Sequence, residues 1–167
     1  MVKNFITFDL ENWYDSEFIK EKSGPDFVLE GLDKAVDLLN KYNVKATFFV
    51  TGDVIKKYPS EIKKLSKEGH EIASHSYEHK MLNKISAKSI KENILKSKNL
   101  IKKVTGKYPL GFRAPSWSIT KDNWWVYDFL YKEGFLYSSS LFPVTIGTVY
   151  GSSHFPTNSF NPINKKN

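Results

Sequence analysis

Cysteine is absent from this sequence of 167 residues, and no apolar run in it is long enough to span a membrane. Without cysteine, disulfides and thiolate zinc sites are excluded, so any metal would have to be bound by histidine and carboxylate side chains. The first residues also lack the basic stretch and apolar run of a signal peptide. We therefore expect a cytoplasmic protein without a membrane span.

The sequence has fewer acidic than basic residues. It has 18 aspartates and glutamates and 25 lysines and arginines, which gives a formal net charge of +7. Most of the basic residues are lysines, and several occur in pairs on segments with helical spacing. A nucleic-acid surface would be richer in arginine or would interleave basic with aromatic side chains. We interpret the lysines as solvated helix faces and expect no nucleic-acid partner. Nothing in the composition sets an oligomeric state.

Strand-like and helix-like segments alternate along most of the chain. The expected strands lie at residues 5–11, 45–51, 71–74, near 111 and at 135–137, and the expected helices at 27–42, 59–69, 86–106 and 121–133. This alternation predicts an α/β fold with a mostly parallel sheet, although periodicity alone does not distinguish an open sheet from a barrel. The pattern fades after residue 143, so we predict a truncated domain over 1–143 and an irregular tail over 144–167.

Three of the four histidines lie between residues 70 and 79, and two of these are four residues apart. His75 is expected at the end of a strand and His79 in the loop or first helical turn that follows, whereas His70 precedes the strand and is interpreted as structural. Ligands gather at the strand ends of parallel α/β folds, and neutral imidazole is a common ligand of divalent metals. Surface histidines beside a lysine-rich helix would have the same spacing, so this pair alone does not establish a metal site.

Three further polar side chains lie at expected strand ends. Asp9 and Glu11 end the first strand and point the same way, because strand side chains alternate with period two, and Arg113 ends the fourth. In a parallel fold these ends share one face, where the side chains can converge with the histidines. Two imidazoles and one carboxylate make a metal site with open positions, and a second carboxylate can act as a general base that an arginine keeps ionised. Solvated acids and a structural salt bridge are the alternatives.

These segments together resemble the polysaccharide deacetylases, the NodB-homology family of metal-dependent carbohydrate esterases. Residues 9–11 are similar to the first motif of that family, and residues 112–117 (Phe-Arg-Ala-Pro-Ser-Trp) are similar to the third. The segment 69–79, with its Gly-His-Glu-Ile and Ser-His-Ser runs, resembles the histidine motif and is the most specific part. The resemblance is close over 45–117 and continues less tightly to about residue 143.

The resemblance implies a distorted (β/α) barrel, incomplete at its C-terminal end, and an enzyme that removes acetyl groups from the N-acetylated sugars of a polysaccharide. Glu11, His75 and His79 would bind a divalent ion, with zinc as the expected metal. Asp9 would be the general base that takes a proton from the attacking water, and Arg113 would orient Asp9. The expected partner is therefore an N-acetylated saccharide substrate.

Aromatic residues near these motifs are candidates for substrate binding. By the resemblance, Trp117 would form part of a sugar-binding wall. Trp13 and Tyr14, directly after the metal carboxylate, would either line the substrate groove or pack in the core.

The sequence departs from the family pattern at two places. Position 10 is leucine where the commoner first motif has a second carboxylate, so the ligand role is assigned to Glu11. The family's late histidine, its general acid, is not found, because His154 lies among proline and serine residues that are not typical of a strand end. The alternative is therefore a truncated or degenerate domain that binds metal or carbohydrate without turnover.

Overall fold

Five parallel strands form one sheet in the computed structural model, which describes residues 4–16, 19–143, 158 and 160–162. The strands are β1 (Thr7–Leu10), β2 (Thr47–Val50), β3 (Glu71–Ser74), β4 (Gly111–Phe112) and β5 (Tyr137–Ser138). Each lies where the sequence predicts a strand, except that β5 begins at the last residue of the predicted segment. The predicted tail, 144–167, lies almost entirely outside the described residues, and the domain boundary at 143 stays a prediction.

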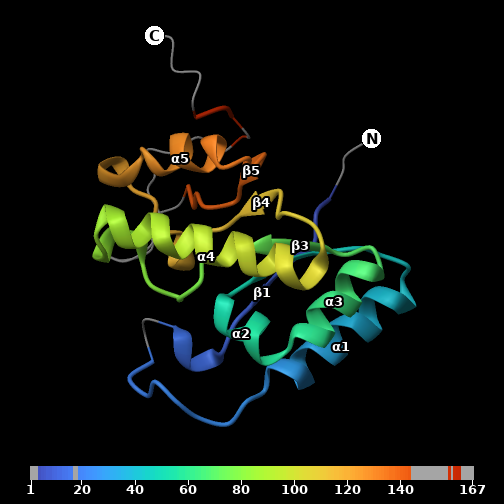
Figure 1. The fold of residues 1–167 in the computed structure, drawn as a ribbon. Helices are drawn as coiled ribbons and strands as arrows, with labels where there is room; N and C mark the ends of the chain where they lie inside the picture. Colours follow the sequence, from blue (N-terminus) through green and yellow to red (C-terminus); the bar gives the residue numbers. More distant parts are fainter. Residues whose placement is uncertain (1–3, 17–18, 144–157, 159, 163–167) are drawn as a thin grey trace.

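Among the described residues, five α-helices connect or follow the strands (Figure 1). They are α1 (Val28–Lys41), α2 (Gly52–Lys57), α3 (Pro59–Lys67), α4 (Ala87–Thr105) and α5 (Val126–Lys132). The hydroxyl of Ser86 accepts a hydrogen bond from Ser89 N at the start of α4, and Gly106 ends α4 with a left-handed φ of 82°. In the described part of the chain, none of the helices is both long and apolar enough to cross a bilayer.

One helix prediction needs correction, and one helix of the structure has no counterpart among the predictions. The helix expected over 121–133 begins only at Val126, because residues 121–123 form a separate 3₁₀ turn. The amide of Asn123 fixes that turn, since its oxygen accepts from Thr120 N and its nitrogen donates to Ser118 O. Helix α2 is not predicted from the sequence at all, because its six residues are too few to show helical periodicity.

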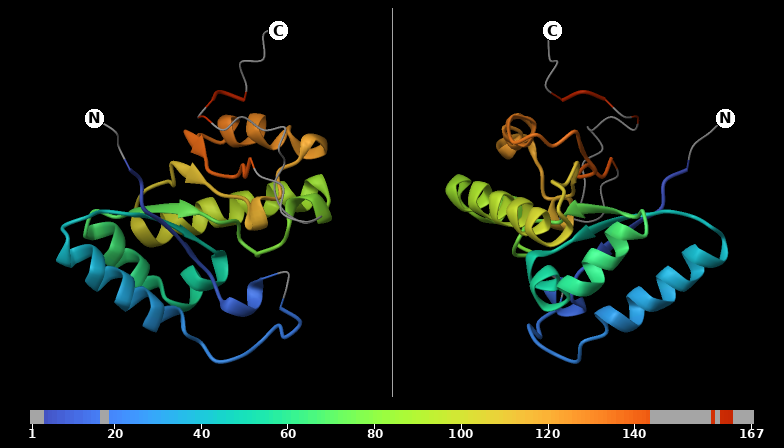
Figure 2. Two further views of the ribbon diagram at one scale, coloured as in Figure 1. Left: turned by 180° about the vertical axis from the view of Figure 1, so that it is seen from behind. Right: turned by 45° about the vertical axis from the view of Figure 1, so that its right-hand side comes forward.

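The strand order β1-β2-β3-β4-β5 follows the order of the chain. Successive parallel neighbours joined by right-handed crossovers place all their helices on one face of the sheet. Helices α3 and α4 pack against each other and against β3, and α4 lies beyond the strands when the molecule is seen from behind (Figure 2). A doubly wound sheet would reverse its order at a switch point, so this arrangement is of the (β/α)-barrel type, as the resemblance implies.

The two faces of the sheet differ in polarity because strand side chains alternate. On the helix side, alternate residues of β1, β2 and β3 join side chains of α1, α2 and α3 in one buried cluster. These strand residues are Leu10, Phe48, Val50 and Ile72, and the partly buried Phe8 packs against them. The opposite face carries polar groups at the N-terminal ends of the strands. There, Glu71 accepts hydrogen bonds from Thr47 Oγ1 and Tyr137 Oη, both at 2.9 Å. The residues predicted for function lie toward the other ends of the same strands.

Candidate metal centre and active site

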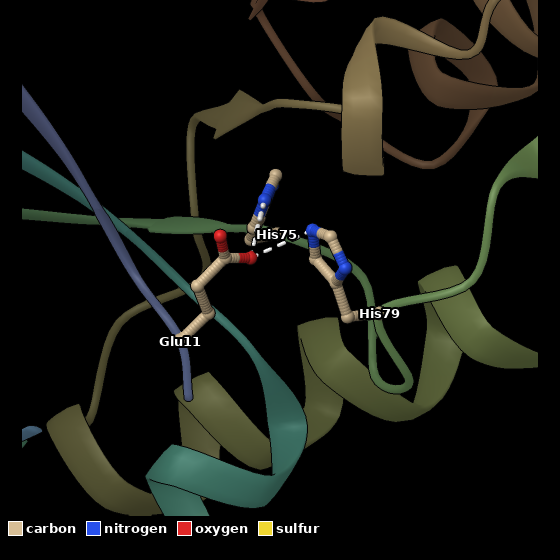
Figure 3. Close-up of side chains that lie close together, drawn as sticks. All are labelled: Glu11, His75 and His79. Atoms are coloured by element: carbon tan, nitrogen blue, oxygen red, sulfur yellow. Dashed lines mark ion pairs between the residues drawn. The ribbon is translucent and has the colours of Figure 1, made fainter. Parts of the chain in front are cut away.

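Glu11, His75 and His79 lie together at the C-terminal edge of the sheet (Figure 3). One nitrogen or oxygen atom from each residue lies within 4.8 Å of the corresponding atoms of the other two. Glu11 comes directly after β1, and His75 directly after β3, while His79 follows in the loop before α4. The structure therefore gathers the three residues predicted as metal ligands, whose role as ligands stays a prediction.

A tight turn returns the chain from His75 to His79. Ser76, at the turn, has a left-handed φ of 67°. The amide of Gly52 donates to the carbonyl of Tyr77 at 2.9 Å, which joins the turn to the start of α2. A Cβ atom at Gly52 would lie 2.4 Å from the Tyr77 ring, so only glycine allows this close approach. The result is a distance of 5.0 Å between the His75 and His79 ring centroids.

Backbone carbonyls fix the orientation of both imidazoles. The Nδ1 atom of His75 lies 2.9 Å from Arg113 O, and that of His79 lies 3.0 Å from Asp15 O. Because a carbonyl can only accept, each Nδ1 must carry a hydrogen and donate it. Each Nε2 then points toward Glu11 Oε2, at 3.4 Å for His75 and 2.6 Å for His79. Such outer partners are typical of histidines that bind metals.

The electron-pair donor atoms of these three residues face one another in a way that would suit a bound cation. With both Nδ1 atoms protonated, the neutral rings direct two nitrogen lone pairs at a carboxylate oxygen. As long as both rings are neutral, that oxygen, Glu11 Oε2, is buried without a hydrogen bond. Three electron-pair donors so placed repel one another unless a positive charge lies among them, and the donor set of two imidazoles and one carboxylate suits zinc and several other divalent ions.

Glu11 and His79 stabilise each other's charged form. Burial alone would raise the pKa of Glu11, but hydrogen bonds and charges from His75 and His79 outweigh it and lower the pKa to about 2. Burial opposes the charged form of His79, yet the hydrogen bond and charge of Glu11 outweigh that effect and raise its pKa. A proton on His79 is thus the alternative to a bound metal, and a metal would have to displace it.

Asp9 and Arg113 form an ion pair beside this cluster. The Nη1 atom of Arg113 donates to Asp9 Oδ1 at 2.6 Å. The side chains of Asp9 and Arg113 are 25% and 11% exposed, so the arginine is the more deeply buried partner. Asp9 lies two residues before Glu11 and faces the same pocket, as strand periodicity predicts.

A small pocket of about 90 Å³ joins the cluster to the ion pair, and part of its wall was not predicted. Its lining residues are Asp9, Glu11, Ser16, His75, His79, Ala114, Ser116 and Trp117. Trp117 lies in the wall, with its ring centroid 5.3 Å from that of Phe142, and its contact with a sugar stays a prediction. Ser116 and Trp117 have left-handed φ angles of 52° and 48°, and such strained backbone is common at functional sites.

Trp13 and Tyr14 do not line this pocket. Trp13 donates from Nε1 to Pro25 O at 2.9 Å, and its ring lies so close to Gly24 that a Cβ there would approach it to 2.4 Å. The Trp13 ring also packs edge-on against Tyr14. Their predicted contact with substrate stays a prediction, and His154 lies outside the described residues.

Comparison with known proteins finds one family over most of the chain. The sequence profile described as polysaccharide deacetylase matches residues 6–131. A peptidoglycan-N-acetylglucosamine deacetylase from Bacillus cereus is 37% identical over 92 residues, which are 55% of this chain and 33% of that protein. A peptidoglycan deacetylase from Helicobacter pylori is 35% identical over 111 residues, which are 66% of this chain and 37% of that protein.

Solved structures show the same relationship. The Bc1960 peptidoglycan N-acetylglucosamine deacetylase, in complex with 4-naphthalen-1-yl-N-oxidanyl-benzamide, aligns with a TM-score of 0.64 and 29% identity over 80% of this chain and 54% of its own. Peptidoglycan deacetylase PdaC from Bacillus subtilis aligns with a TM-score of 0.60 and 27% identity over 81% of this chain and 56% of its own. The chain thus spans about half the length of these solved chains and about a third of the length of these curated relatives.

Proposed function

The chain belongs to the polysaccharide deacetylase family, and we propose that it provides the metal centre and general base of a hydrolase that removes acetyl groups from N-acetylated sugars. The observation that carries this proposal is the convergence of Glu11, His75 and His79 beside the Asp9–Arg113 pair. The substrate would be a glycan that contains N-acetylglucosamine, as the names of the relatives suggest. The reaction would cleave the amide C–N bond with water and release acetate and a free amine.

Zinc is the ion we propose for the cluster, held by Glu11 Oε2 and by the Nε2 atoms of His75 and His79. When bound, such an ion would lower the pKa of a water molecule and polarise the acetyl carbonyl. The carbonyls of Arg113 and Asp15 would keep the two rings in the tautomer that leaves Nε2 available.

Asp9 would act as the general base. Arg113 occupies its Oδ1 atom, so Oδ2 would accept the proton from the attacking water. The proton held on Asp9 would then be available to the leaving nitrogen, which must gain one when the C–N bond breaks. Arg113 would keep the Asp9 carboxylate turned toward the pocket during both transfers.

Aromatic side chains would position the sugar. Trp117 forms part of the pocket wall, where its ring would pack against the apolar face of a sugar ring. Trp13 is 41% exposed and follows Glu11 closely in the chain, so with Tyr14 it would contact sugar units beyond the pocket. The absence of a nucleic-acid partner and the cytoplasmic location stay predictions from the sequence.

Acetate release tests the proposal. The chain would be incubated with N-acetylglucosamine oligomers after addition of zinc or cobalt, and in parallel after treatment with a chelator. We expect acetate release that depends on the metal and disappears when both His75 and His79 are changed to glutamine. Tight metal binding without acetate release would instead support a domain that binds metal or carbohydrate without turnover.

A further inference from the structure

Arg113 is the only arginine in the sequence, and every nitrogen of its guanidinium has a partner. Its Nη1 atom bonds to Asp9, and its Nη2 atom donates to Thr7 Oγ1 at 3.1 Å. The Nε and Nη2 atoms also donate to Ser139, to the carbonyl oxygen at 3.2 Å and to Oγ at 2.8 Å. The ring of Phe49 lies below the group, with its centroid 4.1 Å from Cζ.

Ser139 thus accepts two hydrogen bonds from one edge of the guanidinium. Because the group is planar and rigid, a partner that engages one edge through two bonds also sets the direction of the other edge. That other edge faces Asp9 and Thr7 on β1. A lysine at 113 would offer no such edge.

The sheet holds Ser139 firmly. Its backbone nitrogen donates to Phe112 O at 2.9 Å, directly after β5. The next residue, Ser140, is fully buried and accepts from Ala114 N at 2.9 Å. Ser139 and Ser140 therefore fix both the side chain of Arg113 and the backbone that follows it, and the carbonyl of Arg113 in turn accepts the hydrogen bond from His75.

We propose that Ser139 is a positioning residue that acts through Arg113 to hold the guanidinium in the plane that engages Asp9. The inference rests on the proposed function, in which Asp9 takes a proton from water. Ser139 itself touches no reacting atom. Loss of its hydroxyl would remove half of the two-bond contact and allow the guanidinium to rotate away from Asp9.

Three variants test this inference. Ser139→Ala removes the hydroxyl, and Ser139→Thr keeps it. The matched control is Ser138→Ala, at the preceding residue, because the Ser138 hydroxyl contacts Ser140 Oγ and not Arg113. If Ser139→Ala does not fold, Ser139→Cys keeps the size of the side chain and replaces the hydroxyl with a weak acceptor.

The first measurement needs no activity. In ¹H–¹⁵N spectra the side-chain signals of a single arginine belong to Arg113 without further assignment. In the unaltered chain, in Ser139→Thr and in Ser138→Ala, we expect these protons to exchange slowly with water and rotation of the guanidinium to be hindered. In Ser139→Ala or Ser139→Cys we expect faster exchange and faster rotation. Unchanged signals in the last two variants, or the same change in Ser138→Ala, would overturn the proposal.

The second measurement is kinetic. Ser139→Ala should lower kcat on N-acetylglucosamine oligomers by about tenfold, with KM and zinc affinity unchanged, since small misplacements of catalytic groups reduce rate more than binding. Ser139→Thr, which keeps the hydroxyl, should have the kcat of the unaltered chain. If KM rises and zinc affinity falls by as much as kcat falls, the role of Ser139 is purely structural and the proposal is contradicted. If the unaltered chain releases no acetate, the proposed function fails, while the spectra still decide whether Ser139 holds Arg113.

Discussion

The carbonyl of Arg113 accepts a hydrogen bond from His75 Nδ1 at 2.9 Å. The guanidinium of the same residue bonds to Asp9. One residue at the end of β4 therefore orients a candidate metal ligand through its backbone and the candidate general base through its side chain. This arrangement links the two parts of the site, so that a shift of the segment around Arg113 would disturb both.

Replacement of Asp9 by asparagine tests its role as the base. Asparagine keeps the shape and can still accept from Arg113, but it cannot take a proton at neutral pH. We expect Asp9→Asn to lower kcat for acetate release by about 10²- to 10⁴-fold, the usual contribution of a general base, with zinc binding retained. Asp122→Asn, in the 3₁₀ turn before α5, should leave kcat unchanged. Activity in Asp9→Asn equal to that of the unaltered chain would exclude Asp9 as the base.

Two glycine substitutions should have opposite effects. In Gly52→Ala the new Cβ would lie 2.4 Å from the Tyr77 ring and 2.7 Å from Tyr77 O, so the turn that carries His79 must move. We expect a loss of about 1–3 kcal/mol in the free energy of unfolding, together with weaker zinc binding. In Gly31→Ala, within α1, the Cβ meets nothing within 4 Å, and a gain of about 0.5–1 kcal/mol is expected. Urea unfolding measures both, and a destabilised Gly31→Ala would contradict this account.

His70 should make the protein less stable in acid. Its side chain is 4% exposed, and its Nδ1 accepts from Ala46 N at 3.2 Å. Burial, and then the charge of Lys45, lower its pKa from the ordinary value of 6.5. The unfolded state therefore takes up the proton first, so the stability that neutral His70 contributes is complete above pH 6.5 and is lost as the pH falls below that value.

His70→Asn provides the comparison, because an asparagine oxygen can replace Nδ1 as the acceptor without titrating. Urea unfolding would be measured at about pH 8 and about pH 5.5. The free energy of unfolding should fall less on acidification in His70→Asn than in the unaltered chain. The two slopes against pH should differ by the equivalent of up to about one bound proton. The other titratable groups are the same in both proteins, so their contributions cancel in this comparison. An equal loss in the two proteins would show that His70 does not contribute.

Much of the fold follows from the sequence because the central strands are buried and the helices are amphipathic. Strand ends in a parallel sheet share one edge, and this rule alone brings Asp9, Glu11, His75 and Arg113 to the same region. The order of the strands does not follow from periodicity, since a barrel and an open sheet share the same alternation of elements. The short helix α2 is also not predictable in this way, because six residues are too few to show a helical period.

Side-chain partners are the part that local patterns do not reveal. Trp13 follows Glu11 in the chain, yet its indole is held by Pro25 O, a contact set by the course of the loop. Ser139 lies across the sheet from Asp9, and only the three-dimensional arrangement shows that Arg113 joins them. The sequence does contain one indication of this role. The Ser-Ser-Ser run at 138–140 follows a predicted strand, and the ends of parallel strands share one edge of the sheet.

Calorimetric titration of zinc into the purified chain tests the central claim most directly. We expect one zinc ion per chain, and a loss of affinity in Glu11→Gln, His75→Gln and His79→Gln that exceeds the roughly 10- to 100-fold effect of outer partners. Glu78→Gln is the control, because this acid lies in the same loop but pairs with Lys80 at the surface. Saturable binding that only the first three substitutions weaken is the predicted result, whereas no binding, or binding that those substitutions leave unchanged, would contradict the metal centre.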